Sequence, residues 1–307
     1  MSRATTDDAP LLIHLHVPKT AGTTLSRMLR LRLLRWPPSH WFDHTTVMGY
    51  YNVPWLEKRY ALMRALPERR QRRVRFFGSH HFGYGVHEHL PSYRSPAYFT
   101  FLRDPLERAM SSYYFLRKEG RVPDGMSLPD FAHQPTPFRT FHFDNCQVRF
   151  LAGEHGDVVD VPFGACTTAM LDRACARLDE MFFVGIVEDF DASVCRFADR
   201  LGLRSMVYAT SQQTKDRPQR EDVDPATIDA LRAMNELDQR LYDHAMALHR
   251  AAVASFGPSF PDRVARFRAR NDRHAGTVGR LYDLLPKARR MMERLHLMPD
   301  GTKHAPS

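Results

Sequence analysis

The segment LLIHLHVPKTAGTTL, residues 11–25, carries residues that could hold a phosphate group. An apolar run leads into a turn with one lysine, one glycine and several threonines, and then into a leucine-rich stretch. Such a turn suits an anion, because free backbone N–H groups and the dipole of the following helix favour negative charge there. An ordinary strand–turn–helix corner is the alternative interpretation. The candidate phosphate ligands are Lys19, Thr20, Ala21, Gly22, Thr23 and Thr24.

The order of these residues differs from that of two common nucleotide-binding motifs. The NTPase loop G-x-x-x-x-G-K-[ST] has its lysine after the glycines, whereas Lys19 precedes Gly22 and no glycine precedes Lys19 in the turn. The turn does not match the dinucleotide motif G-x-G-x-x-G either. It therefore predicts phosphate binding without identifying the nucleotide.

A second segment, FLRDPLERAMSSYYF (101–115), could complete an anion site. Arg103 ends an aromatic, β-branched run that predicts a strand, so we expect its side chain at the carboxyl edge of a sheet, where ligands of open α/β folds bind. Ser111 is expected two turns into the next helix, facing the same edge. An arginine fork and a hydroxyl could together grip a phosphate. Alternatively, Arg103 pairs with Asp104 at a helix start and Ser111 is a packing residue.

The stretch SHHFGYGVHEH (79–89) offers groups that could accept a proton. The ordinary pKa of histidine lies near neutrality, which suits a general base. His80 and His81 follow a predicted strand at 74–78, so they are expected at the same sheet edge as Arg103. A metal site is the alternative, but the spacing matches no helical motif such as H-E-x-x-H, and the glycines indicate a loop. We therefore expect no metal.

The surrounding pattern predicts an α/β fold that brings these segments together. Strands alternate with helices, which implies a mainly parallel central sheet with helices on both faces, a three-layer, P-loop-like fold. A proline-containing break at 256–261 predicts a main domain (1–255) and a basic helical C-terminal tail (256–307). The predicted strands are 11–17, 74–78, 97–102 and 181–187, and the predicted helices are 22–35, 55–66, 105–120, 141–152, 167–180, 188–201 and 225–250, with a loop at 36–54.

The chain has 307 residues and a formal net charge of +9, which suits anionic ligands such as nucleotides, sulfated sugars, nucleic acid or an anionic membrane face. No stretch approaches the roughly 20 uninterrupted apolar residues of a spanning helix, and the N-terminal MSRATTDDAP lacks the apolar core of a secretory signal. We therefore expect a cytoplasmic protein with reduced cysteines. The tail arginines are first interpreted as a solvated face. Guidance of an anionic polysaccharide and peripheral membrane contact are the alternatives.

Taken together, HVPKTAGTTL and FLRDPLERAMSSYYF resemble the two phosphate-binding segments of the sulfotransferases. The resemblance is closest to the branch that contains the heparan sulfate 2-O- and 6-O-sulfotransferases and their bacterial relatives. It implies that the first segment binds the 5′-phosphosulfate of 3′-phosphoadenosine 5′-phosphosulfate (PAPS), and that Arg103 and Ser111 bind its 3′-phosphate. It covers roughly residues 11–220 and extends through HHFGYG (80–85), DNCQVRFLAG (144–153) and FFVGIVEDFDASVCRF (182–197).

The resemblance implies sulfuryl transfer from PAPS to a hydroxyl of a carbohydrate or glycolipid acceptor, with no metal and no nucleic acid. Lys19 would stabilise the leaving phosphate. The GSHH sequence at 78–81 departs from the family's Gly-His pattern, and alignment on Gly85 makes His81 the expected base and His80 the second candidate. The polar loop at 210–220 would close over the 3′-phosphate or adenine, or would be a solvated surface loop. Its candidate ligands are Thr214, Lys215 and Arg217.

Three further polar residues have two interpretations each. In a helix, Asn145 and Arg149 would share a face, which could reach a ligand or form a polar network between helices. Glu188 could orient the base, but a helix cap is the preferred interpretation. For the whole chain, the alternatives to a sulfotransferase are a P-loop nucleotide kinase-like enzyme and a non-enzymatic basic module that binds polyanions or nucleic acid.

Overall fold

The computed structural model describes residues 10–33, 61, 64–65, 67–72, 74–79, 83–89, 93–133, 140, 142–153, 161–203, 206–209 and 220–294. In chain order the elements are β1 (Leu11–Leu15), α1 (Gly22–Leu33), α3 (Glu68–Gln71), β2 (Phe76–Ser79), a 3-10 helix (Val86–His89), β3 (Pro96–Leu102), α4 (Pro105–Lys118), α5 (Leu128–His133), α7 (Cys146–Ala152), α8 (Thr168–Glu180), β4 (Phe183–Ile186), α9 (Phe190–Arg200), a 3-10 helix (Arg220–Asp222), α10 (Pro225–Met234), α11 (Glu236–Ala254) and α12 (Phe260–Arg294).

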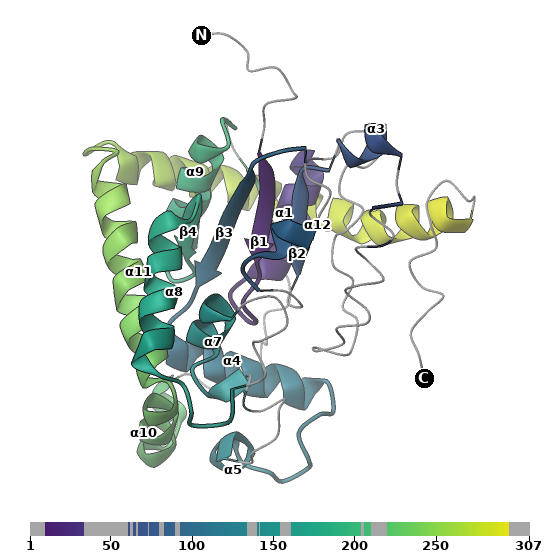
Figure 1. Cartoon of the computed structure of the whole chain (residues 1–307). Coiled ribbons are helices and arrows are strands. Elements are labelled where there is room, and N and C mark those ends of the chain that lie inside the picture. Colours follow the sequence, from purple (N-terminus) through teal and green to yellow (C-terminus); the bar gives the residue numbers. More distant parts are fainter. Residues whose placement is uncertain are drawn as a thin grey trace.

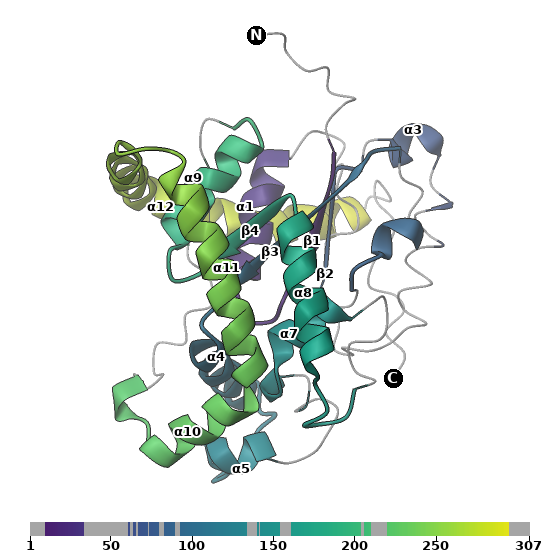
Figure 2. The same ribbon diagram turned by 60° about the vertical axis from the view of Figure 1, so that its left-hand side comes forward.

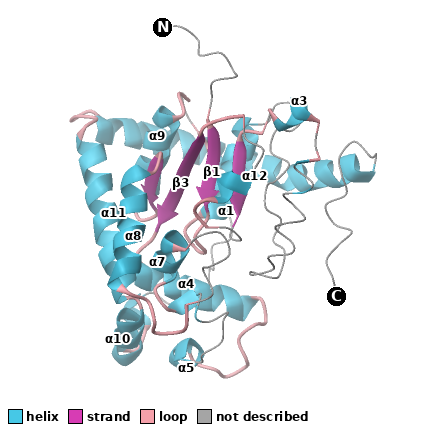
Figure 3. Ribbon diagram, viewed as in Figure 1, coloured by secondary structure: helices cyan, strands magenta, loops and turns pink. Residues whose placement is uncertain are grey.

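The described strands form one parallel sheet in the order β2-β1-β3-β4 (Figure 3). Leu15 of β1 is in register with Ser79 of β2, and His14 is in register with Phe99 of β3. All five residues of β1 are buried, because β1 has a strand on each side and helices over both faces. The carboxyl ends of parallel strands share one edge, so the chain leaves β1, β2 and β3 at the same side of the sheet.

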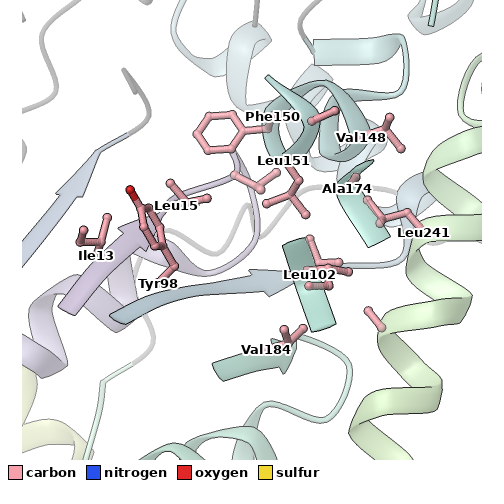
Figure 4. Close-up of a cluster of buried hydrophobic side chains, with 14 of the residues drawn as sticks. Ile13, Leu15, Tyr98, Leu102, Val148, Phe150, Leu151, Ala174, Val184 and Leu241 are labelled. Atoms are coloured by element: carbon pink, nitrogen blue, oxygen red, sulfur yellow. The ribbon is translucent and has the colours of Figure 1, made fainter. Parts of the chain in front are cut away.

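One face of the sheet is covered by α7, α8 and α11, and Figure 2 shows α8 and α11 side by side. Ile13 and Leu15 of β1 belong to the buried cluster on this face (Figure 4). They pack in it with Phe150 of α7, Ala174 of α8 and Leu241 of α11. This cluster fixes α7 above the sheet.

The opposite face is covered by α1, α9 and α12 (Figure 1). Leu12 of β1 and Phe99 of β3 lie there in a second cluster with Met28 of α1, Phe197 of α9 and Phe267 of α12. Side chains alternate between the two faces along a strand, so β1 supplies both clusters. Two helical layers around one parallel sheet confirm the predicted three-layer α/β architecture.

Helices α4, α5 and α10 form a third apolar cluster beyond the carboxyl edge of the sheet (Figure 1). Met110 and Leu116 of α4 pack there with Phe131 of α5 and Leu231 of α10. This packing holds α4 immediately after β3, to which it is joined through Arg103 and Asp104.

Two predicted helices differ from the observed ones at an asparagine. The predicted helix 225–250 is wrong as a single element, because α10 ends at Met234 and α11 begins at Glu236. Asn235 lies between them, and its Nδ2 donates to Leu231 O at 2.8 Å. Asparagine side chains compete for backbone groups in this way and favour helix ends. The helix predicted at 141–152 is interrupted, because His142 and Phe143 are helical but Asn145, just before α7, has a left-handed φ of 47°.

The C-terminal part is one long helix, α12, whose first turns join the core through Phe260 and Phe267. The division of the chain between residues 255 and 256 stays a prediction. No helix within the described ranges combines the length and apolar character needed to cross a membrane. All four cysteines are free thiols. The loop predicted at 36–54 and most of the predicted helix 55–66 lie outside the described residues.

His14 of β1 is a buried aromatic residue beneath the turn that follows the strand. Its ring stacks between His16, at 4.9 Å, and Phe99, at 4.7 Å between ring centroids. Neither ring nitrogen has a hydrogen-bond partner among the described residues. Burial lowers the pKa of His14 to about 3, because a charged imidazole would lose its hydration there. The side chain therefore acts as a neutral ring.

We expect His14→Phe to make folding less sensitive to acid. The folded-state pKa of His14 lies below the ordinary value of 6.5, so the stability that it contributes is complete above that pH and is lost as pH falls towards about 3. At about pH 5 the loss is about 2 kcal/mol. Urea denaturation at about pH 7 and about pH 5 should show a stability difference about 2 kcal/mol smaller in the variant. The control is His274→Phe at an exposed site. If the stability difference between the two pH values were the same in the wild type, the variant and this control, His14 would not be a buried neutral ring.

Candidate functional site

The turn after β1 has a backbone that residues other than glycine rarely adopt. Lys19 has a φ of 68° and Ala21 a φ of 62°, both left-handed, whereas Thr20 between them is not in that region. Alternation of this kind points successive N–H groups into one concavity, which is a favourable place for an anion. Each strained residue costs about 1–3 kcal/mol, and such residues cluster at functional sites. The turn therefore has the backbone of an anion-binding loop at the start of α1.

Thr20 and His16 hold this loop from the inside. Thr20 Oγ1 donates to Val17 O at 2.8 Å, and the residue is fully buried. The ring of His16 lies against Gly22, where a Cβ atom would come within 1.7 Å of His16 Nε2. Glycine is therefore required at position 22 by the close approach of the histidine. Because the Thr20 hydroxyl already donates within the loop, the backbone N–H is the donor through which Thr20 would bind an anion.

Two other predicted ligands lie at the start of α1. Thr23 is half-buried and Thr24 is buried. Both belong to the first turn of the helix, whose backbone N–H groups have no partner within the helix. The two threonines are thus where an anion held by the loop would meet the helix N-terminus.

Arg103 contacts the loop directly. Its Nη1 donates to Lys19 O at 3.4 Å, which joins the end of β3 to the turn after β1. Its guanidinium also lies near two carboxylates, with Glu107 Oε2 at 3.5 Å from Nη2 and Glu188 Oε1 at 3.9 Å from Nε. The two segments that the sequence singled out for phosphate binding are therefore in direct contact.

One face of α4 spans the distance between Arg103 and Lys19. Glu107, Ser111 and Phe115 are four residues apart, so they share this face. Glu107 pairs with Arg103, and the ring of Phe115 lies 4.0 Å from Lys19 Nζ. Ser111 lies between these two contacts and is 9% exposed. Its hydroxyl is therefore on the side of α4 that faces both cations.

The backbone at Arg103 is fixed by Gln147 of α7, a residue of the DNCQVRFLAG segment to which the sequence assigned no role of its own. Gln147 Oε1 accepts from Arg103 N at 3.1 Å, and its Nε2 donates to Arg103 O at 2.9 Å. Helix α7 is itself held by the buried carboxylate of Asp238 in α11, which accepts from the backbone N–H groups of Gln147 at 3.0 Å and Val148 at 2.7 Å. The orientation of Arg103 thus depends on a residue far along the chain.

Asn145 and Arg149 form a polar network between helices. Asn145 Oδ1 accepts from the second and third backbone N–H groups of α11, at 2.9 and 3.1 Å. Arg149 is fully buried, pairs with the Asp144 carboxylate and donates to Pro162 O at 2.8 Å. Of the two interpretations of this pair, the structure shows the polar network between helices.

Glu188 does not cap α9, so the preferred interpretation from the sequence is wrong. The residue at the N-cap is Asp189, whose side chain makes no capping hydrogen bond. Glu188 Oε1 accepts from Asp104 N at 3.1 Å, and Oε2 accepts from the Tyr242 hydroxyl at 2.8 Å. Burial raises the pKa of Glu188, and its hydrogen bonds and Arg103 oppose that rise. The carboxylate therefore supports the start of α4 beside Arg103.

Two buried histidines, His14 and His142, are weak bases. Burial lowers the pKa of His14 to about 3. Burial also lowers the pKa of His142 to about 3, and the charges of Arg108 and Lys19 act in the same direction. A general base works best when its pKa is close to the operating pH. Neither side chain therefore fits that role at neutral pH.

Five predicted site residues lie outside the described part of the chain: His80, His81, Thr214, Lys215 and Arg217. Their roles stay predictions. Within the described ranges, no group of three or more His, Cys, Asp and Glu side chains could hold a metal ion.

We expect Gly22→Ala to destabilise the fold, because its methyl group would overlap the His16 ring. Overpacking of this kind costs about 1–3 kcal/mol. His16→Ala in the same chain removes the ring, so the double variant should lose less stability than the sum of the two single variants. Urea denaturation of all four proteins measures this coupling. Losses that add to within about 0.5 kcal/mol would show that the two residues are not in contact.

The chain matches the galactose-3-O-sulfotransferase family over residues 4–285. This range contains the loop after β1, β3, α4 and about the first three-quarters of α12. A comparison with curated proteins finds no match. The family match supports the sulfotransferase expected from the sequence, but not the heparan sulfate branch specifically. The chain therefore belongs to the galactose-3-O-sulfotransferase family and is a sulfotransferase.

Proposed function

We propose that this protein transfers a sulfuryl group from PAPS to a hydroxyl of a carbohydrate, and that the 3-hydroxyl of galactose is its target. The contact between Arg103 Nη1 and Lys19 O carries the donor assignment. PAPS has phosphate groups on the 3′ and 5′ positions of one ribose, so it needs two anion sites close together. The loop at Lys19 and the cation at Arg103 are such a pair.

The described residues fit this donor. The loop N–H groups and Lys19 would hold the 5′-phosphosulfate at the start of α1, where the helix dipole adds to the attraction. Arg103 and Ser111 would hold the 3′-phosphate. The carboxylates of Glu107 and Glu188 lie 3.5 and 3.9 Å from the Arg103 guanidinium, longer than the roughly 2.7–2.9 Å of a strong charge-assisted hydrogen bond. A phosphate could therefore compete with them.

The roles of the chain's residues follow from the charges that develop during transfer. When bound, PAPS supplies a sulfuryl group whose bond to the 5′-phosphate oxygen breaks as its bond to the acceptor oxygen forms. Lys19 and the loop N–H groups stabilise the negative charge left on the 5′-phosphate. We further propose that the loop containing Thr214, Lys215 and Arg217 holds the nucleotide portion of the donor.

A base must take the proton that the acceptor hydroxyl loses, and we assign this role to His81, with His80 as the second candidate. Strand β2 ends at Ser79, in register with Leu15 at the end of β1, so the chain reaches the edge of the loop just before these histidines. The proton would then rest on the imidazole.

The acceptor proposal follows from the family that the chain matches. Galactose-bearing oligosaccharides and glycolipids are the first candidates, and a heparan-type backbone is the second, from the resemblance of the sequence motifs. Every observation that favours the nucleotide-kinase or the polyanion-binding alternative favours a sulfotransferase as well.

We expect the desulfated donor, 3′-phosphoadenosine 5′-phosphate, to raise the melting temperature of the protein, because a ligand that binds the folded state stabilises it. ATP with magnesium should leave the melting temperature unchanged. Arg103→Ala should weaken binding by about tenfold or more, through loss of a charged hydrogen bond. Titration calorimetry measures the affinity, and Arg117→Ala, an exposed arginine of α4, is the matched control. Equal affinity of the Arg103 variant and the control would remove Arg103 from the donor site.

We expect His81→Ala to slow transfer by about 10²–10⁴-fold while nucleotide affinity stays unchanged, because loss of a general base affects the chemical step. Labelled donor and a galactose-terminated oligosaccharide would give the rate, and calorimetry the affinity. A greater loss of rate in His80→Ala would make His80 the base. Unsulfated heparan is the comparison acceptor, and preferential labelling of it would overturn the galactose assignment while leaving sulfuryl transfer intact.

A further inference from the structure

A half-open cavity of about 440 Å³ lies between α9 and α12. None of the described lining residues belongs to the loop after β1, to β3 or to α4, so this part of the wall is separate from the described residues of the proposed donor site. Its apolar walls come from both helices and from the segment between α9 and α10. The lining residues are Val194, Cys195, Ala198, Met206, Phe267 and Ala269, together with Arg263, Arg266, Arg270 and Arg273.

The four arginines lie on one face of α12. Their spacing of three, four and three residues keeps them on the same side of a helix. Arg263 is neutralised by Asp199, at 2.5 Å. The other three have no carboxylate within ion-pair distance in the described part of the chain, and Arg270 Nε is buried there without a hydrogen-bond partner. An unbalanced group of cations at one cavity favours a bound anion.

The cavity walls indicate what kind of anion would fit. Among the lining side chains that belong to the described part of the chain, arginine supplies strong donors, and none is an amide, a hydroxyl or a carboxylate. A sugar presents both donors and acceptors, so its hydroxyl protons would find no strong side-chain acceptor there. A phosphate presents acceptors only, and Phe267 and Met206 suit an attached hydrocarbon chain. The chemistry is therefore that of an acidic lipid.

The same face of α12 continues with exposed apolar residues. Leu281 and Leu284 follow Arg270 and Arg273 by 11 residues each, which is about three helical turns. Their side chains are 44% and 55% exposed. Cations followed by exposed leucines on one face are typical of helices that lie in a membrane interface.

We infer that the cavity between α9 and α12 binds the phosphate headgroup of an acidic membrane lipid, and that the arginine face of α12 brings the protein to an anionic membrane surface. Arg266, Arg270 and Arg273 hold the phosphate, Phe267 and Met206 contact the first part of the acyl chains, and the two leucines enter the interface. This inference does not depend on sulfuryl transfer.

Vesicle co-sedimentation of the full chain tests the charge requirement. The wild type should bind vesicles that contain phosphatidylglycerol and should not bind vesicles of phosphatidylcholine alone. Each arginine near an anionic surface contributes about fivefold in affinity, so Arg270→Gln with Arg273→Gln should weaken binding by about 25-fold. Arg240→Gln with Arg250→Gln removes the same charge from exposed sites on α11 and is the matched control. Equal weakening by the two pairs would reduce the effect to net charge and overturn the site.

Ala269→Trp tests the cavity itself, because it keeps every charge and fills the space. It should weaken vesicle binding as the arginine pair does, with circular dichroism and thermal unfolding confirming the fold. Undiminished binding by this folded variant would exclude the cavity. Displacement from vesicles by free glycerol phosphate would assign the site to a soluble phosphate, and displacement by a heparin oligosaccharide at equal charge would assign it to a polysaccharide. Either result would overturn the lipid proposal.

Discussion

The contact between Arg103 Nη1 and Lys19 O joins the two segments of the candidate site, and the remaining structure keeps them in that position. Lys19 lies in a backbone conformation that costs about 1–3 kcal/mol, so the loop exists only because its surroundings stabilise it. Arg103 supports the loop from outside, and the Thr20 hydroxyl and the His16 ring support it from inside. Because parallel β1 and β3 end at one edge, residues more than 80 positions apart can share this task.

The support continues outward through uncharged and charged hydrogen bonds. Gln147 fixes the backbone of Arg103, and Asp238 fixes the helix that carries Gln147. Glu188 fixes Asp104 at the start of α4 and is itself held by Tyr242. An arginine that must grip an anion needs a rigid base, and these side chains provide it without occupying the loop. Under the proposed donor assignment, the buried polar residues of the sheet edge supply the precision that phosphate binding would demand.

The sequence was sufficient for the features that depend on local pattern. The strands, the α/β layering, the loop at Lys19 and the pairing of that loop with Arg103 all follow from periodicity and from the rule that parallel strands end together. The helix break at Asn235 and the role of Glu188 did not follow, and the polar network of Asn145 and Arg149 was only one of two interpretations that the sequence left open. Their side chains bond to groups that only the folded chain brings close, up to 93 residues away for Asn145. Local propensity contains no information about such partners.

Side chains at the starts of α7 and α11 cap each other's helices, and this limits how far the chain can be shortened and still fold. Asn145 satisfies the first N–H groups of α11, and Asp238 satisfies those of α7, so neither helix can separate without exposing buried polar groups on both. The proposed donor ligands within the described residues all lie before position 112, yet a truncated chain that stops ahead of α11 would leave α7 uncapped and Gln147 without its anchor. An excised N-terminal half would therefore not keep its shape: the strands and loop that come before position 112 and the C-terminal helices must fold as one cooperative body.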